Sequence, residues 1–123
     1  FHSIAISQYI GPFRSLDWAV CAKRAEPTLL TLLARPPRKR SFWNVNLPHP
    51  IDDNPDCSVV HCQPDPSPHL ARYTKNQDGN FEDESNYHDR PRLPDLDIDI
   101  CFRGQITVSE VGLYPGLGEP DAV

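Results

Sequence analysis

A strand followed by a helix is what the pattern of apolar and polar positions predicts for the start of the chain. Residues 3–7 read SIAIS, a short apolar run rich in β-branched side chains, which is typical of a strand buried on both faces. Residues 16–34 then place apolar side chains at helical spacing, with Ser15 as the expected N-cap. Pro27 interrupts this stripe, so we expect a kink or two abutting helices.

A second strand is predicted at 42–47, where the chain reads FWNVNL before Pro48 stops it. The intervening helix is long enough for a crossover connection, so this strand and residues 3–7 should be parallel neighbours in one sheet. Residues 1–50 are therefore expected to form the βαβ part of an α/β domain, with helices packed on the sheet.

The pattern changes in residues 51–114, which alternate polar loops with short strands. The run CSVVHC indicates a short strand, and residues 69–87 indicate an antiparallel hairpin with its turn at Asp78-Gly79. We expect this hairpin to project from the α/β body. Residues 115–123 are rich in glycine and proline and are expected to be a mobile tail.

Three aspartates at alternate positions, Asp95, Asp97 and Asp99, fit either a metal site or the solvated face of a strand. Neighbours on one strand face lie roughly 6.6 Å apart, so three in a row cannot share one cation, and no glycine-rich loop folds them together. Apolar residues, including Ile98 and Ile100, occupy the positions between them. The pattern predicts a half-buried strand with its acids in solvent, paired with QITVSEVGL as a second antiparallel hairpin.

Composition narrows the class of protein. The formal net charge of −5 argues against a nucleic-acid surface, and the basic cluster at 35–40 is expected to be a solvated loop. No apolar run approaches the length of a membrane span. Four scattered cysteines without a C-x-x-C pair are expected to be reduced thiols of a cytoplasmic protein. The lack of methionine and the apolar start favour a piece of a longer chain.

Motifs of known catalytic chemistry are missing from the sequence. It contains no Walker loop, no G-x-S-x-G, no H-E-x-x-H and no dinucleotide fingerprint. Cys57 and His61 would share a strand face roughly 13 Å apart, too far for one zinc ion. The residues alone thus indicate an α/β body with an antiparallel appendage and no visible catalytic set.

Three segments resemble a known family. FHSIAIS at the start, WNVNLP in the second strand and NYHDRPRLPDLDIDICFRGQITVSEVGL near the end are similar, in order and spacing, to the C-terminal half of the stationary-phase survival protein SurE family, in its cyanobacterial-like branch. The resemblance extends from residue 1 to about residue 114. It implies a partial Rossmann-like, three-layer α/β sheet with an antiparallel hairpin used in homo-oligomerisation.

The resemblance also implies an activity, which is the metal-dependent hydrolysis of nucleoside monophosphates and other phosphomonoesters by a 5'/3'-nucleotidase or acid phosphatase. In that family a Mg²⁺ or Mn²⁺ ion is held by an Asp-Asp pair near the N-terminus, and a loop at a helix start holds phosphate. Neither motif occurs here, because Asp52-Asp53 lies in a proline-rich loop that does not match the family's pair. We assign no catalytic residue, metal ligand or cofactor to this segment and expect it to be inactive alone.

Ser7, Gln8 and Asn46 are the residues that this interpretation places nearest a ligand. Ligands of open α/β sheets bind beyond the carboxyl ends of parallel strands, and these residues end the two predicted strands. We expect them to line the substrate-side wall in the complete protein, with the satisfaction of loop backbone groups as the competing role of Ser7 and Asn46. The alternative function is a stand-alone, non-catalytic oligomerisation or binding module.

Overall fold

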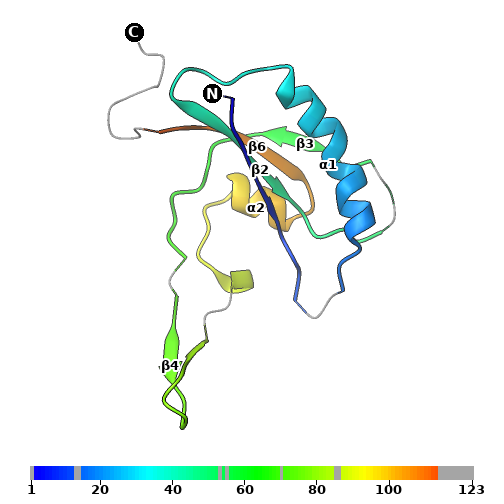
Figure 1. Cartoon of the computed structure of the whole chain (residues 1–123). Helices are drawn as coiled ribbons and strands as arrows, with labels where there is room; N and C mark the ends of the chain where they lie inside the picture. The colour runs from blue at the N-terminus through cyan, green and yellow to red at the C-terminus, as the bar shows by residue number, and fades with distance from the viewer. Residues whose placement is uncertain are drawn as a thin grey trace.

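Three layers of secondary structure make up the body of the protein, with a thin ribbon extending from it (Figure 1). The computed structural model describes residues 2–12, 15–52, 54, 56–69, 71–84 and 87–113, so the predicted tail at 115–123 lies outside the described residues. The elements are β1 (Ile4–Gln8), α1 (Trp18–Leu33), β2 (Ser41–Leu47), β3 (Val59–His61), β4 (Tyr73–Lys75), β5 (Phe81–Asp83), the 3₁₀ turn η1 (Tyr87–Asp89), α2 (Asp97–Phe102) and β6 (Ile106–Gly112). None of the described helices combines the length and the apolar character needed to cross a bilayer.

Strands β1 and β2 are parallel neighbours, which confirms the predicted βαβ unit. Their register runs from Ile4 opposite Trp43 to Gln8 opposite Leu47, and α1 forms the connection between them. The prediction of an α/β body with a separate antiparallel hairpin is confirmed with it.

Helix α1 is capped by Asp17 rather than by the expected Ser15. Asp17 Oδ1 accepts hydrogen bonds from the backbone N–H groups of Ala19 at 3.0 Å and Val20 at 3.3 Å. These bonds satisfy two of the donors that a first helical turn leaves free. The expectation of two abutting helices is wrong, because a single helix continues through Pro27, which lies on the exposed side.

The four-stranded sheet has the order β1-β2-β6-β3. Strand β6 pairs antiparallel with β2 on one side and parallel with β3 on the other. The predicted strands CSVVHC and QITVSEVGL are therefore present as β3 and β6. The predicted second hairpin, in which DIDICF pairs with QITVSEVGL, is not formed. Strand β6 lies instead between β2 and β3, two strands that come earlier in the chain.

The two faces of the sheet differ in polarity, and this difference decides where the core lies. Trp43 and Val45 of β2 share one face with Ile106 and Val108 of β6, and α1 packs on that face through residues such as Leu32. The opposite face carries the alternate residues of the same strands, including Asn46 and Thr107, and α2 packs against it. Helix α2 therefore covers a polar face of the sheet, and the polar side chains that it buries need hydrogen-bond partners.

Strand β1 is an exposed edge strand, which corrects the expectation of a strand buried on both faces. Ile6 lies opposite Val45 on the face that α1 covers, yet it is 49% exposed. Within the described part of the chain, β1 pairs only with β2. Among the described residues, the apolar run SIAIS therefore pairs with a strand on one side only, and most of its residues are exposed.

Strands β4 and β5 form the predicted antiparallel ribbon, which Figure 1 shows pointing away from the body. Tyr73 pairs with Asp83 and Lys75 pairs with Phe81. Gly79 closes the turn at a φ of 81°, a left-handed conformation that glycine adopts without strain. Tyr73 and Phe81 lie on the same face of the ribbon and are exposed.

Helix α2 occupies residues 97–102, where the alternating pattern predicted a strand. Asp97, Ile100 and Cys101 are buried together, because positions three and four apart share one face of a helix. Over only six residues the sequence DIDICF satisfies the helical period as well as the strand period. Helix α2 contacts the polar face of the sheet. Gly104 then turns the chain toward β6 at a φ of 105°.

Candidate functional site

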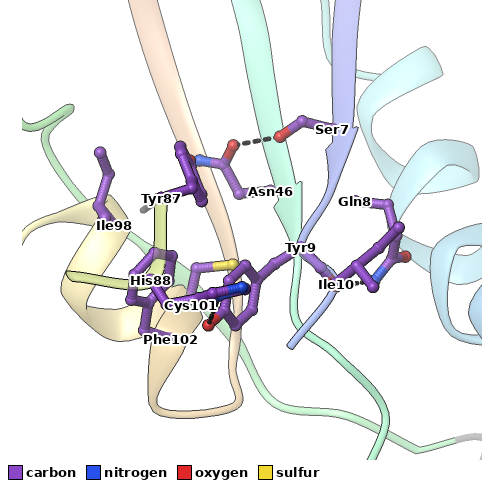
Figure 2. A pocket seen from close by; sticks show the side chains of 10 residues that line it. All are labelled: Ser7, Gln8, Tyr9, Ile10, Asn46, Tyr87, His88, Ile98, Cys101 and Phe102. Carbon is purple, nitrogen blue, oxygen red and sulfur yellow. Dashed lines mark hydrogen bonds between the residues drawn. The ribbon is translucent and has the colours of Figure 1, made fainter. Parts of the chain in front are cut away.

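A hollow of about 360 Å³ lies at the carboxyl ends of β1 and β2 (Figure 2). Its walls come from the end of β1, from β2, from η1 and from α2. The lining residues are Ser7, Gln8, Tyr9, Ile10, Asn46, Tyr87, His88, Ile98, Cys101 and Phe102. The three residues expected at this edge from the sequence, Ser7, Gln8 and Asn46, therefore lie around one cavity.

An aromatic wall closes one side of this hollow. The ring of Tyr9 stacks on Phe102 with centroids 4.2 Å apart and planes inclined by 18°, and the His88 ring lies 5.6 Å from that of Tyr9 (Figure 2). The Tyr9 hydroxyl hydrogen-bonds to His88 Nδ1 at 2.9 Å, and the Tyr87 ring lies 5.7 Å from Phe102. Flat rings of this kind offer a surface on which a planar ligand can stack.

A row of polar side chains crosses the sheet beside the aromatic wall. Ser7 Oγ donates to Asn46 Oδ1 at 2.6 Å, a bond drawn in Figure 2. The Asn46 amide donates in turn to Thr107 Oγ1 and to Asp97 Oδ2, both at 3.1 Å. Asn46 is consequently held in one orientation by three partners on three different elements, which makes it a fixed polar group at the edge of the hollow.

Asp97 is buried, and its carboxylate is fully engaged. Oδ1 accepts the backbone N–H of Asp65 at 2.7 Å and that of Ile98 at 2.8 Å, while Oδ2 accepts the Asn46 amide. The prediction of a solvated strand face is therefore wrong for Asp97, which joins α2 to strand β2 and to the loop that follows β3. Such a carboxylate stabilises the fold, because each donor around it would otherwise be buried without a partner.

Asp99 lies on the outer side of α2 in an ion-pair cluster. The backbone N–H of Asp95 donates to it at 3.0 Å, and the guanidinium groups of Arg103 and Arg92 lie 3.3 and 3.5 Å away. The hydrogen bond from Asp95 and the two arginines hold the pKa of Asp99 below its ordinary value, against the opposing effect of desolvation. Only Asp95, exposed and paired with Arg103, fits the predicted solvent-facing position.

Cys101 lines the hollow, but its thiol is expected to be unreactive. Burial, reinforced by the nearby Asp97 carboxylate, raises the pKa of its thiol to about 12. A thiol needs to lose its proton to act as a nucleophile or metal ligand. Cys101 therefore contributes apolar surface rather than a reactive group.

The described residues do not bring their acidic, histidine and cysteine side chains together in a cluster of the kind that holds divalent metals. They contain no group of three or more histidine, cysteine, aspartate or glutamate side chains close enough to hold an ion. Asp52 is paired with Arg24 at 2.9 Å, and Asp53 lies outside the described residues.

The sequence pattern placed three of the lining residues at this edge of the sheet, but it did not indicate most of the other residues that line the hollow. Gln8 turns its amide to the backbone after β2, donating to Pro48 O at 3.0 Å, so it holds the strand ends together. Tyr9 follows directly on β1, so the rule that ligands bind beyond strand ends gave a signal for it. Tyr87, His88 and Phe102 reach the hollow from distant segments, and no pattern around them identifies this role.

No protein-family model matches this chain. Two cyanobacterial proteins, both named "Putative 5'-nucleotidase", are similar to it: one from Synechocystis sp. is 36% identical over 109 residues, and one from Nostoc sp. is 37% identical over 108 residues. These alignments cover 89% and 88% of this chain but only 48% and 47% of the relatives, so the chain spans about half of their length. The similarity supports a relationship to nucleotidases.

Proposed function

We propose that the chain is one half of a metal-dependent nucleotidase of the SurE type, which hydrolyses nucleoside monophosphates or related phosphomonoesters. The observation that carries the proposal is the similarity of nearly the whole chain to two proteins named as 5'-nucleotidases. The resemblance of FHSIAIS and WNVNLP to SurE segments supports the same assignment. In this proposal the segment corresponds to the C-terminal half, and the complete enzyme is a cytoplasmic homo-oligomer.

The hollow at the ends of β1 and β2 is the proposed wall for the nucleoside part of the substrate. Its position agrees with the general placement of ligands at the carboxyl ends of parallel strands. Tyr9, backed by the ring of Phe102, offers a stacking surface, and the oxygens of Ser7 and Asn46 lie at its rim. Stacking of one base on an aromatic side chain contributes about 1–3 kcal/mol without demanding a particular base.

The metal and the phosphate-binding loop belong to the other half in this proposal. Asp97 has its oxygens engaged by protein donors, and Asp52 is paired with Arg24. When bound, Mg²⁺ or Mn²⁺ supplies Lewis-acid activation of the phosphate and of water. The residues described here position the substrate's organic part, and the segment alone is expected to lack turnover.

Kinetics of the assembled protein test this role. We expect Phe102→Leu to raise the KM for a nucleoside 5'-monophosphate about tenfold while leaving the KM for ribose 5-phosphate within about twofold, since stacking acts only on the base. Tyr9→Phe keeps the stacked ring and removes only the hydroxyl bound to His88, so it is the matched control. Equal effects of Phe102→Leu on both substrates would contradict the placement of the base.

A stand-alone oligomerisation module is the second candidate function. The ribbon β4–β5 favours it, because Tyr73 and Phe81 expose aromatic rings on one face of an isolated two-stranded unit. Two-stranded ribbons are marginally stable in water and gain from packing on a partner. This candidate requires self-association through the ribbon and no contribution to hydrolysis in any assembly.

A further inference from the structure

Arg92 contacts both of the residues that hold the Tyr9 ring. Tyr9 stacks on Phe102 of α2, and its hydroxyl hydrogen-bonds to His88 Nδ1 in η1. The Arg92 guanidinium lies over the Phe102 ring, 4.6 Å from its centroid, and Arg92 Nη1 donates to the backbone oxygen of His88 at 3.3 Å. One side chain therefore joins η1 and α2, the two elements that meet at Tyr9.

The ring of Phe102 is sandwiched between a tyrosine ring and a guanidinium. Tyr9 covers one face of the ring at an inclination of 18°, which leaves the other face for Arg92. A guanidinium is planar and is attracted to the π face of an aromatic ring, so it can stack on the ring and donate hydrogen bonds in its own plane at the same time. Arg92 thus supports Phe102 on the side opposite to Tyr9.

Asp99 holds the guanidinium in this place. Arg92 Nε lies 3.5 Å from Asp99 Oδ1, and Asp99 and Phe102 share one flank of α2 because they are three residues apart. The Arg92 side chain is 34% exposed, so this ion pair by itself contributes little to stability. Its consequence is geometric: a carboxylate, a ring and a backbone oxygen surround one guanidinium, and few orientations remain open to it.

We propose that Arg92 is a positioning residue for the base of the substrate, because it holds Phe102 and His88 in the places from which they orient the Tyr9 ring. Arg92 is not among the residues that line the hollow, so it acts through Tyr9 rather than on the ligand. The choice of a nucleobase as the ligand rests on the proposed function, whereas the packing of the rings does not.

Proton NMR of the chain alone reads the position of the Tyr9 ring. A ring stacked on Phe102 is shielded by its ring current, so the Tyr9 ring signals should lie upfield of those of an exposed tyrosine. Tyr9→Phe identifies these signals by their loss. Arg92→Gln should move them most of the way back to the position of an exposed tyrosine.

Arg103→Gln is the matched control. The Arg103 guanidinium also pairs with Asp99, at 3.3 Å, and it reaches Asp95 at 2.8 Å. The variant removes the same charge and one partner of Asp99 while keeping Arg92, so the Tyr9 signals should stay where they are. Arg92→Lys keeps the charge but lacks the planar fork, so it should behave like Arg92→Gln. Full recovery of the Tyr9 signals in Arg92→Lys would show that charge alone is sufficient and would overturn the positioning role.

Ligand binding and kinetics measure the consequence. Arg92→Gln should weaken the binding of adenosine to the chain alone about threefold to tenfold. In a mixture of the chain with the unaligned half of the Synechocystis relative, it should raise the KM for a nucleoside 5'-monophosphate by a similar factor. The kcat, and the KM for ribose 5-phosphate, should stay within about twofold, since stacking acts only on the base. Circular dichroism checks that the variants fold, and Arg92→Lys is the second variant if Arg92→Gln does not.

The outcomes separate this inference from the proposed function. Displaced Tyr9 signals and weakened adenosine binding in Arg92→Gln, without hydrolysis by a mixture shown to form a complex, would support the positioning role and refute the nucleotidase assignment. Hydrolysis together with unchanged Tyr9 signals in Arg92→Gln would do the reverse. Equal increases in the KM for both substrates, equal effects of Arg103→Gln, or no binding of adenosine by the parent chain would overturn the inference.

Discussion

The side-chain amide of Asn46 donates a hydrogen bond to Asp97 Oδ2 at 3.1 Å and thereby joins strand β2 to helix α2 across 51 positions of the chain. Ser7 and Thr107 complete the same row of polar groups. This row fixes α2 against the sheet, and α2 carries Phe102 into the hollow. The shape of the proposed nucleoside wall therefore depends on a polar network within the fold.

Asp97→Asn should lower the free energy of unfolding by about 1–3 kcal/mol, because it removes the charge and turns an amide toward the donors now satisfied by the carboxylate. Asp95→Asn is the control. Asp95 is exposed at a φ of 62°, a conformation that asparagine also tolerates, so its replacement should change stability by less than about 0.5 kcal/mol. Urea unfolding measures both variants, and equal effects would show that the buried network is not stabilising.

Stability should fall in acid. Desolvation alone would raise the pKa of Asp65, but hydrogen bonds from Ser67 and Leu93 outweigh it, so the pKa of Asp65 is lowered from 3.8, as is that of Asp99. A carboxyl with a depressed pKa in the folded state contributes stability above its ordinary pKa and loses it as pH falls through the folded value. The free energy of unfolding should thus decrease below about pH 4.

Asp99→Asn should flatten this dependence, since the variant lacks a carboxylate whose pKa is lowered in the folded state. Urea midpoints at pH 6 and pH 3 provide the comparison between parent and variant. A parent protein whose midpoint rises in acid would show that these hydrogen bonds and ion pairs do not act as described.

Cys101 should be the slowest of the four thiols to react with iodoacetamide at pH 8. Its pKa of about 12 leaves almost no thiolate, and burial limits access to it. Cys57, which is less buried, should react first. Intact-mass measurements with peptide mapping follow the order of labelling, and unfolding in urea should remove the difference between the two sites. Labelling of native Cys101 as fast as Cys57 would contradict the packing of α2.

Self-association should depend on the ribbon. Replacement of residues 73–83 by a short glycine-serine loop removes both strands and should convert the protein to a monomer in sedimentation velocity at equal concentration. Tyr73→Ser with Phe81→Ser keeps the ribbon but removes its exposed aromatic face. It should weaken association to a similar extent, because the aromatic area supplies most of the apolar contact. Unchanged sedimentation of both variants would exclude the ribbon as the interface.

Local patterns predicted the elements that a continuous apolar run, a long helical stripe or a turn signal marked. SIAIS, FWNVNL and the helix between them gave the parallel pair, and Asp78-Gly79 gave the ribbon turn. The six residues of α2 were misassigned, since a pattern that short fits two periods and the buried partners of Asp97 lie far away in the chain.

The residues of the candidate site likewise fall into those that a local pattern predicted and those that it did not. Ser7, Gln8 and Asn46 could be expected at one edge, because the ends of adjacent parallel strands meet there. Phe102 and His88 arrive through α2 and η1, whose placement depends on tertiary hydrogen bonds that no local pattern encodes. The exposure of Ile6 was missed for a related reason, as an apolar strand predicts burial but does not show which neighbour provides it.

Phosphate release from nucleoside monophosphates by the two halves together tests the proposed function most directly. The chain, the unaligned half of the Synechocystis relative and their mixture are each assayed with and without Mg²⁺ or Mn²⁺. Turnover should require both polypeptides and the metal, and Phe102→Leu in the mixture should reduce it at low substrate concentration. Metal-dependent turnover by the chain alone, or none by a mixture shown to form a complex, would contradict the proposal.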